Sequence, residues 1–251
     1  MTLSEILREH SPALVALSGG TDSMTLLAAF VKEGLPVCAA TIRSEFTPPD
    51  EVTRAEHFAR RLGVNWRVID VSVLSEEHLQ FNPPNRCYIC KKLIMTKILE
   101  AADGKTVCDG THADDAAEER PGRKALTELG IVSPFALARI GKKEIYALAK
   151  EFGVPVIPSS SCLATRIPFG EEITEGSLKK IAEAESFLRE KGITGMLRVR
   201  LSSGRAVIET ENNEKAHAEL YADDLKTFGF STITFREYKT GGGNSWNRIE
   251  Q

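Results

Sequence analysis

The fold of this chain is decided by one short stretch, Ser18–Ser23, with the sequence SGGTDS. It lies between two apolar runs, at residues 13–17 and 24–30. The first run has the length of a buried strand, and the second has the composition of a helix. The stretch is therefore predicted to be a strand-to-helix turn. Its small residues allow backbone N–H groups to approach a phosphate, which the helix dipole also favours.

The turn differs from two familiar phosphate-binding loops. No Lys-Ser/Thr pair follows a long glycine loop, and no G-x-G-x-x-G pattern is present. The turn resembles instead the SGGxDS loop of the PP-loop ATP pyrophosphatases. This resemblance implies that ATP is cleaved between its α- and β-phosphates, giving an adenylated substrate and pyrophosphate. The alternative is an ordinary glycine-rich turn without a ligand. In either case Thr21, Asp22 or Ser23 is expected to cap the helix.

Composition narrows the class of protein. The chain has 251 residues and a net charge of −3, which argues against a protein that mainly grips a nucleic-acid backbone. No apolar run reaches the roughly 20 residues that span a bilayer, and the N-terminus is polar rather than a signal peptide. A cytoplasmic location without membrane contact is therefore expected. In that compartment the five cysteines are not expected to form a disulfide framework.

Apolar runs alternate with helical patterns over most of the chain. The strands are expected at residues 13–17, 37–42, 66–71 and 106–109, and the helices between and after them at 50–62, 86–102 and 142–152. This alternation predicts an α/β fold with a parallel sheet covered on both faces.

The pattern changes near residue 170. A long amphipathic helix is expected at 174–191, a hairpin at 196–201 and 205–209, one helix at 213–228 and a last strand at 232–236. We therefore expect two domains: residues 1–172 with the parallel sheet, and residues 173–251 as a small α+β domain for substrate binding or oligomerisation.

Two cysteines, Cys87 and Cys90, form a CxxC pair at the start of a predicted helix. The helix dipole and the neighbouring basic residues favour their thiolate forms. Such a pair is half of a zinc site, a redox pair, or half of an iron–sulfur site. A second CxxC and a nearby histidine pair are both missing from the sequence, which disfavours zinc.

The other three cysteines lie in different settings. Cys162 belongs to a polar, proline-bounded loop after the last helix of the predicted sheet, where such folds often place chemistry. The alternative is an inert loop cysteine. Cys38 and Cys108 lie inside apolar strand patterns, so both are predicted to be small buried hydrophobic residues.

Several segments together resemble the LarE family of ATP-dependent sulfur transferases. They are residues 18–23 (SGGTDS), 82–91 (NPPNRCYICK), 109–115 (DGTHADD), 120–125 (RPGRKA), 162–170 (CLATRIPFG) and 197–200 (LRVR). The resemblance covers nearly the whole chain. It implies the PP-loop fold, an adenine nucleotide alpha hydrolase-like parallel sheet flanked by helices, with a small C-terminal α+β domain.

The resemblance also implies an activity. The family adenylates a carboxylate of pyridinium-3,5-dicarboxylate mononucleotide and then replaces the AMP with sulfur, giving a thiocarboxylate of the nickel-pincer nucleotide cofactor used by lactate racemase. Two sulfur sources occur in the family. Either the cysteine matching Cys162 gives up its own sulfur, or three cysteines hold a 4Fe-4S cluster whose open iron carries sulfide. Because Cys87 and Cys90 accompany Cys162, the cluster is favoured.

Roles for individual residues follow from the motifs. The residues expected to bind ATP are Ser18, Gly19, Gly20, Asp22, Ser23, Thr41, Asp109, Gly110 and Thr111. Asp22 is also expected to help to hold Mg²⁺. The candidates for the substrate phosphate are Arg123, Lys124, Arg166, Arg198 and Arg200, because arginine pairs well with phosphate.

For some of these residues a plainer role remains open. Arg198 and Arg200 share one face of a strand and are alternatively surface charges. Asp114 and Asp115 are either metal ligands or helix caps, and the cap is favoured.

Three rival functions remain open. A tRNA thiolase of the same superfamily needs a basic RNA-binding surface, which the charge balance does not indicate. An amidating PP-loop enzyme does not need three cysteines. A nucleotide or metal sensor binds ATP without releasing pyrophosphate. We expect as partners a small nucleotide substrate, a sulfide donor and further copies of the chain, with nucleic acid unlikely.

Overall fold

The computed structural model describes residues 1–117, 121–158 and 161–239. Contacts divide the chain into two compact units, the first formed by residues 1–71 and 87–159 and the second by residues 72–86 and 160–251. The domain boundaries expected from the sequence, 1–172 and 173–251, stay a prediction. The units differ from them because residues 72–86 and 160–172 pack with the C-terminal part of the chain.

A parallel sheet forms the centre of the first unit. Its strands are β1 (Ala13–Ala16), β2 (Val37–Arg43), β3 (Asn65–Asp70) and β4 (Thr106–Cys108), in the order β3-β2-β1-β4. Every neighbouring pair is parallel, with Ala13 opposite Val37 on one side and Thr106 on the other. The α/β fold with a parallel PP-loop-type sheet is thus confirmed, and all four strands lie where the apolar runs predict them.

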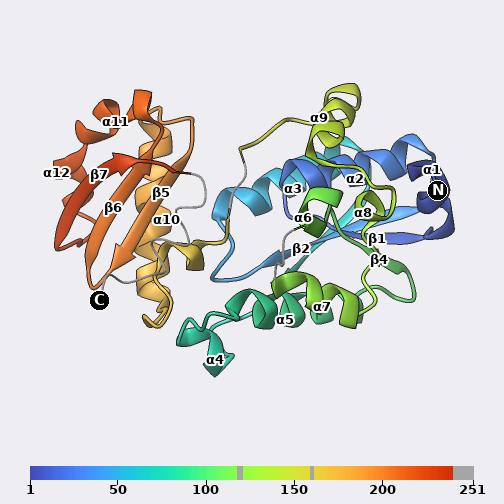
Figure 1. Ribbon diagram of the computed structural model, residues 1–251, viewed down its shortest axis with the longest axis horizontal. Helices are drawn as coiled ribbons and strands as arrows, with labels where there is room; N and C mark the ends of the chain where they lie inside the picture. Colours follow the sequence, from blue (N-terminus) through green and yellow to red (C-terminus); the bar gives the residue numbers. More distant parts are fainter. Residues whose placement is uncertain (118–120, 159–160, 240–251) are drawn as a thin grey trace. The chain divides into compact units, whose positions relative to one another are not determined.

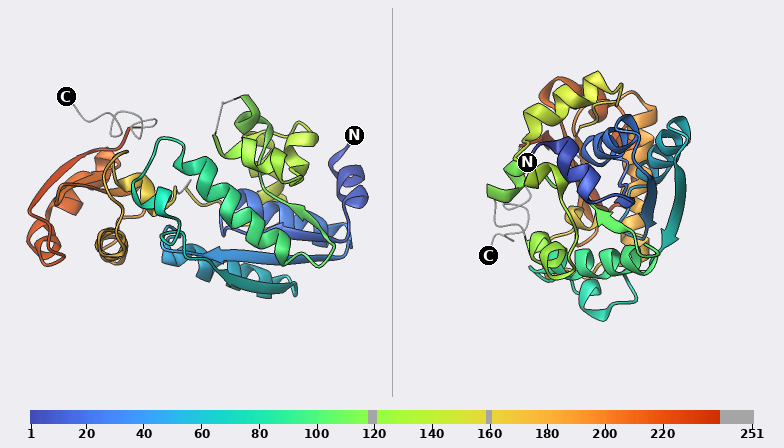
Figure 2. Two further views of the ribbon diagram at one scale, coloured as in Figure 1. Left: turned by 90° about the horizontal axis from the view of Figure 1, so that it is seen from below. Right: turned by 90° about the vertical axis from the view of Figure 1, so that its right-hand side faces the viewer.

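Helices cover both faces of this sheet. They are α1 (Leu3–Glu9), α2 (Thr21–Lys32), α3 (Pro49–Arg61), α5 (Arg86–Glu100), α6 (Ala113–Ala117), α7 (Pro121–Glu128), α8 (Pro134–Leu137) and α9 (Lys142–Glu151). Figures 1 and 2 show α5 and α7 on one face, with α2 and α9 on the other.

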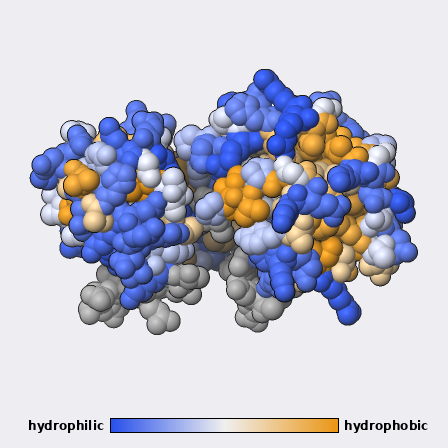
Figure 3. Space-filling view, turned by 90° about the horizontal axis from the view of Figure 1, so that it is seen from above, coloured by the Kyte–Doolittle hydropathy of each residue, from blue (hydrophilic) through white to orange (hydrophobic). Residues whose placement is uncertain are grey.

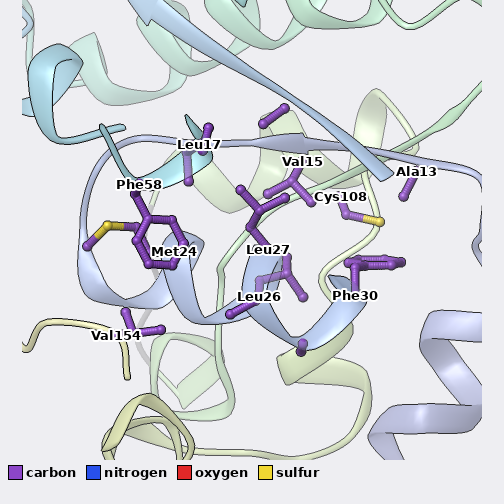
Figure 4. Packing of buried hydrophobic residues seen from close by; sticks show 14 of the residues in the cluster. Ala13, Val15, Leu17, Met24, Leu26, Leu27, Phe30, Phe58, Cys108 and Val154 are labelled. Atoms are coloured by element: carbon purple, nitrogen blue, oxygen red, sulfur yellow. The ribbon is translucent and has the colours of Figure 1, made fainter. Parts of the chain in front are cut away.

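The strand period of two divides the core into two layers. Ala13 and Val15 of β1 face α2, whereas Leu14 faces α5. Helix α2 is almost entirely buried, and Figure 4 shows its Leu27 and Phe30 beside the β1 side chains. Burying one such side chain contributes about 1.5–3 kcal/mol. This packing fixes the axis of α2 and therefore the place of the turn before it.

The second unit has its own sheet, in the order β5-β6-β7. Its elements are α4 (Glu77–Gln80), the 3₁₀ helix η1 (Leu163–Arg166), α10 (Glu175–Glu190), β5 (Leu197–Ser202), β6 (Arg205–Thr210), α11 (Asn212–Glu219), α12 (Ala222–Lys226) and β7 (Thr232–Glu237). Strands β5 and β6 form the predicted antiparallel hairpin, and β7 is parallel to β6. The small C-terminal α+β fold is confirmed.

One predicted helix is wrong. The sequence indicates a single helix at 213–228, but the structure has α11 and α12 with a break at Leu220 and Tyr221. Both residues donate their N–H groups three residues back, to the carbonyls of His217 and Ala218, which tightens the chain. The Tyr221 ring packs edge-on against Phe187, with 5.8 Å between centroids. This packing is a tertiary contact that helical periodicity cannot show.

The surface is mixed in character. Hydrophobic residues gather in patches on the face of the first unit that Figure 3 shows, while the second unit is mostly hydrophilic there. Within the described ranges 1–117, 121–158 and 161–239, no helix is both long and apolar enough to cross a membrane.

Burial of Cys108 predicts an alkaline loss of stability. Cys108 is fully buried, as expected, whereas Cys38 is only half-buried. Burial, and secondarily Asp109, raises the pKa of the Cys108 thiol from 9.0 to about 12. Above pH 9 the unfolded chain loses this proton while the folded protein keeps it, so stability falls as pH rises, by up to about 1.4 kcal/mol per pH unit.

Urea unfolding of the wild type and Cys108→Ala at pH 7 to 10 measures this effect. The stability difference between the two proteins should be constant up to about pH 8.5 and should then shift against the wild type. Parallel pH profiles up to pH 10 would contradict the buried thiol.

Candidate active site

The turn between β1 and α2 has no side-chain cap. Gly20 is the N-cap residue of α2, and no side chain there accepts a hydrogen bond from the helix. The first N–H groups of a helix have no partner within the helix itself. The expectation that Thr21, Asp22 or Ser23 caps α2 is wrong, because these side chains have other partners.

Hydroxyl groups fix the turn from within. The Ser18 N–H donates to the Ser23 Oγ at 3.1 Å, and the two hydroxyls lie 3.1 Å apart. The Ser23 hydroxyl also contacts the Gly20 carbonyl at 3.1 Å. The Thr21 hydroxyl accepts from the Ile157 N–H at 2.9 Å. The turn is thus held in one shape by its own serines and by the segment after α9.

Two glycines permit a close approach of backbones at this turn. Gly19 has a φ of +78°, and a Cβ there would lie 2.3 Å from the Glu51 carbonyl oxygen. A Cβ on Gly110, at the end of β4, would lie 2.8 Å from the Ser23 nitrogen. Any larger residue at either position would push the backbone away. The carboxyl ends of β1 and β4 therefore meet at the start of α2.

Other residues predicted to bind ATP serve the fold with their side chains. The Asp109 carboxylate accepts from the Thr111 hydroxyl at 2.6 Å and the Ser133 hydroxyl at 2.6 Å. The buried Thr41 hydroxyl donates to the Leu17 carbonyl at 2.7 Å. These groups hold the strand ends in register. A contact of Thr41, Asp109 or Thr111 with the nucleotide stays a prediction.

The two consecutive aspartates after β4, Asp114 and Asp115, cap helices, which is the role favoured from the sequence. Asp114 accepts the N–H of Lys142, the first residue of α9, at 2.7 Å. Asp115 accepts the His112 N–H at 3.3 Å and donates its own N–H to the His112 Nδ1 at 3.4 Å, which caps α6. These two carboxylates therefore stabilise helix starts at the sheet edge.

Asp22 has a partner that the sequence did not reveal. Its carboxylate oxygens lie 2.5 and 2.7 Å from the Nζ of Lys142. The two residues are 120 positions apart, so no local pattern connects them. The only available signal is a lysine in the first turn of a predicted helix, where the dipole disfavours a cation.

The CxxC pair begins α5 in the first unit. Cys87 is exposed and Cys90 is half-buried. Tyr88 between them donates its hydroxyl to Glu128 of α7 at 2.7 Å. Lys124 of α7 lies above the Tyr88 ring, 5.5 Å from its centroid. Solvent therefore reaches Cys87, and Cys90 in part, while contacts of Tyr88 with α7 hold this end of α5 in place.

Cys162 lies in the second unit, immediately before η1, and is half-buried. Buried arginines hold the backbone carbonyls around it. Arg166 donates to the carbonyls of Ser161 at 2.7 Å and Cys162 at 3.1 Å. Arg200 donates to the Thr165 carbonyl at 2.8 Å. The turn that carries Cys162 is thus fixed from both sides of η1.

Carboxylates compensate two of these arginines. Glu185 of α10 receives two hydrogen bonds from Arg166, at 2.9 and 3.0 Å. Glu209 of β6 receives one from Arg200 at 2.9 Å. Such buried, paired guanidinium groups are costly to disrupt. Neither glutamate belongs to a sequence motif, so sequence reasoning missed both.

Arg198 is also buried, and reading Arg198 and Arg200 as surface charges is wrong. Burial, followed by the nearby charge of Arg166, lowers the Arg198 pKa to about 10. The guanidinium remains protonated at neutral pH. Of the five phosphate candidates, Arg166, Arg198 and Arg200 belong to the second unit, whereas Arg123 and Lys124 belong to the first.

A second set of contacts holds the segment before Cys87 against the turn that follows Cys162. The Asn82 side chain donates to the carbonyls of Ile167 at 3.1 Å and Pro168 at 2.6 Å. The buried Arg86 guanidinium donates to the Ala164 carbonyl at 3.1 Å and lies over the Phe169 ring. These contacts lie within the second unit and explain the NPPNR sequence, whose role the sequence alone did not indicate.

The described ranges contain no group of three His, Cys, Asp or Glu side chains that could hold a metal ion. Cys87 and Cys90 belong to the first unit and Cys162 to the second, so neither unit alone contains all three thiols. Arg120, part of the RPGRKA stretch, lies outside the described residues.

Comparisons with known proteins find relatives along nearly the whole chain. An uncharacterized protein from Methanocaldococcus jannaschii is 37% identical over 234 residues, which are 90% of this chain and 89% of that protein. The pyridinium-3,5-bisthiocarboxylic acid mononucleotide synthase of Lactiplantibacillus plantarum is 30% identical over 244 residues, 93% of this chain and 88% of the synthase.

Two further matches cover part of the chain. The family described as queuosine biosynthesis protein QueC matches residues 12–80, which include the turn before α2. An NMN synthetase structure from Francisella tularensis aligns with 61% of this chain and 68% of that chain, with a TM-score of 0.49 and 20% identity. The likenesses to the Methanocaldococcus jannaschii protein and to the synthase both extend over both units.

The close approach at Gly19 predicts a position-specific loss of stability. Gly19→Ala places a Cβ against the Glu51 carbonyl at a positive φ, so the free energy of unfolding should fall by about 2 kcal/mol or more. Gly20→Ala is the matched control, because its Cβ would meet only the Ser18 hydroxyl at 3.5 Å. It should cost less than about 1 kcal/mol. Urea unfolding measures both, and equal losses would contradict this geometry.

Proposed function

Because the chain belongs to the LarE family of PP-loop sulfur transferases, we propose that it adenylates a carboxylate of pyridinium-3,5-dicarboxylate mononucleotide and converts it to a thiocarboxylate. The observation that carries this proposal is the uncapped start of α2 behind a turn that only glycine permits. Free N–H donors at a helix N-terminus, with the helix dipole behind them, bind a phosphate group.

The proposed reaction has two displacement steps. A carboxylate oxygen of the substrate attacks the α-phosphorus of ATP, and pyrophosphate leaves. A sulfur nucleophile then attacks the activated carbonyl carbon, and AMP leaves with that oxygen. The first step converts a poor electrophile into an acyl donor. Ser18, Gly19, Gly20, Asp22, Ser23 and Gly110 are the residues that we expect around the pyrophosphate, mostly through backbone donors.

Magnesium is the expected counter-ion of the ATP phosphates. Mg²⁺ usually binds one or two protein carboxylates together with substrate phosphates and water. The half-buried Asp22 carboxylate in the first turn of α2 fits that role, and it supplies one oxygen ligand rather than a complete site.

For the sulfur we favour a 4Fe-4S cluster held by Cys87, Cys90 and Cys162. None of these thiols is fully buried, in contrast to Cys108. Arg86 directly precedes Cys87 and donates to the carbonyl of Ala164, two residues after Cys162. This contact fixes the chain immediately before Cys87 within the second unit. A cluster with three protein thiolates offers one open iron for sulfide.

The alternative sulfur source is Cys162 itself. In that case the cysteine gives up its sulfur once and remains as dehydroalanine. The arginines that hold the carbonyls of Ser161, Cys162 and Thr165 would serve either mechanism, since both need a fixed Cys162.

The arginines of the second unit also support binding of an anionic substrate. We propose that the substrate phosphate binds among Arg166, Arg198 and Arg200, and that Arg123 and Lys124 of α7 are further candidates. Arginine is suited to this task because its planar guanidinium pairs with phosphate oxygens bidentately.

Self-association completes the proposal. The hydrophobic patches on the first unit in Figure 3 are the kind of surface that subunit contacts cover. A homo-oligomer is therefore expected, and its mass in solution measures this.

The adenylation step predicts a substrate-dependent release of pyrophosphate. With Mg·ATP, the protein should release one pyrophosphate per AMP only when pyridinium-3,5-dicarboxylate mononucleotide is present. A coupled pyrophosphate assay and mass spectrometry of the nucleotide measure both. Unmodified tRNA is the parallel substrate: pyrophosphate release with tRNA alone would replace the proposal with tRNA thiolation. ATP binding without release would indicate a sensor.

The cluster predicts a defined spectroscopic response. Anaerobic reconstitution of the wild type with iron and sulfide should give close to four iron and four sulfide per chain, together with the broad visible absorption of an iron–sulfur cluster. Cys162→Ala should lose or degrade this cluster, and Cys38→Ala is the matched control that should keep it. If no protein binds a cluster and Cys162 becomes dehydroalanine after one turnover, the sacrificial mechanism is correct.

A further inference from the structure

The contact between Asp22 and Lys142 is not used by the proposed function. Nζ of Lys142 lies 2.5 and 2.7 Å from the two carboxylate oxygens of Asp22, and both partners lie in the first unit. The side chains are 31% and 29% exposed, so the pair is partly desolvated but open to a ligand. An ion pair that solvent still reaches in this way is screened and adds little to the stability of the fold. Its position therefore needs another explanation.

The lysine stands where helix electrostatics disfavour it. Lys142 is the first residue of α9, and its ammonium group contacts the first turn of α2. The positive ends of two helix dipoles therefore repel the same cation. The first turns of α2 and α9 each carry one acidic residue, Asp22 and Glu144, as the first turns of α1, α3 and α10 carry acids, but only here does a lysine also meet two helix starts among the contacts described. An anion at this place would be stabilised by both helix starts and by Lys142.

The backbone around Lys142 is built to hold it there. Its N–H donates to Asp114 at 2.7 Å, and the preceding Gly141 N–H donates to Glu144 at 3.1 Å. A Cβ on Gly141 would lie 2.9 Å from both Asp114 oxygens, so only glycine lets this acid approach. The Tyr146 ring lies 5.1 Å from Nζ. Asp114, which follows β4, thus helps to hold Lys142 beside the turn before α2.

We propose that Lys142 is a phosphate-binding residue of this site and that Asp22 holds its ammonium group in place until ATP binds. The ammonium then transfers from the carboxylate to a phosphate oxygen of the pyrophosphate group. The same exchange frees the Asp22 carboxylate to act as a magnesium ligand. This inference rests on the proposed function, because it assumes that the turn before α2 binds pyrophosphate.

Binding of inorganic pyrophosphate tests the inference without any catalytic turnover. Calorimetry with and without Mg²⁺ is to be done on the wild type, Lys142→Met, Lys142→Arg and Asp22→Asn, with melting temperatures of each. Lys142→Met should bind pyrophosphate about tenfold to hundredfold more weakly, because it loses one charged hydrogen bond. Lys142→Arg should retain most of the affinity. Lys143→Met is the matched control, because Lys143 is exposed and lies next in the chain.

The Asp22 variant separates a phosphate ligand from a structural ion pair. If Asp22 competes with phosphate for Lys142, Asp22→Asn should bind pyrophosphate several-fold more tightly without Mg²⁺ and should lose the gain that Mg²⁺ gives the wild type. If the pair only connects α2 to α9, Asp22→Asn and Lys142→Met should weaken binding alike.

The remaining outcomes decide between this inference and the proposed function. Wild-type affinity in Lys142→Met, or no pyrophosphate binding by the wild type, would overturn the inference. If Lys142→Met melts far below the wild type, Lys142→Arg and Asp22→Asn carry the test. Pyrophosphate binding that depends on Lys142, in a protein that never releases pyrophosphate from ATP, would keep the inference and reject adenylation.

Discussion

The second unit depends on one constraint: a guanidinium group taken out of water must have its hydrogen bonds made by the protein. Arg166 and Arg200 meet this requirement by donating to backbone carbonyls of the turn that carries Cys162. Arg86 meets it in part, because its Nη1 donates to the Ala164 carbonyl while its buried Nε has no partner in the described part of the chain. The same bonds therefore satisfy the arginines and immobilise the turn. Glu185 also accepts the Val199 N–H, so one carboxylate joins α10, β5 and η1. Removing any one of these hydrogen-bond partners would leave a buried charge without compensation in an apolar interior.

The first unit depends instead on close approach of backbone to backbone. Gly19 against Glu51, and Gly110 against Ser23, bring strand ends and helix starts nearer than side chains would permit. A turn made in this way is rigid without a side-chain cap, so the first N–H groups of α2 remain available. Both units thus fix a segment of the candidate site by its main chain and leave its polar groups or thiols accessible.

The sequence predicts the parallel sheet well because its strands are short apolar runs between clear turn signals. It predicts the CxxC helix and the hairpin for the same local reason. It does not predict the Lys142 contact with Asp22 or the Asn82 contacts with Pro168, since the partners are 120 and 86 residues apart. The alternation of Arg198 and Arg200 shows that they share a face, but β5 is buried on both faces except at its end. The alternation of side chains along a strand therefore could not distinguish a surface arginine from a buried one.

The three phosphate candidates of the second unit, Arg166, Arg198 and Arg200, differ in their surroundings. Arg166 and Arg200 each have a carboxylate within 3 Å that already balances their charge. Arg198 has its pKa lowered to about 10, because burial and the charge of Arg166 outweigh the attraction of Glu185. Burial therefore opposes the Arg198 charge, and a phosphate bound beside it would add a favourable charged contact. Arg166 and Arg200 also donate to the carbonyls of the Cys162 turn, so in the proposed site they would position Cys162 as well as contact the substrate phosphate.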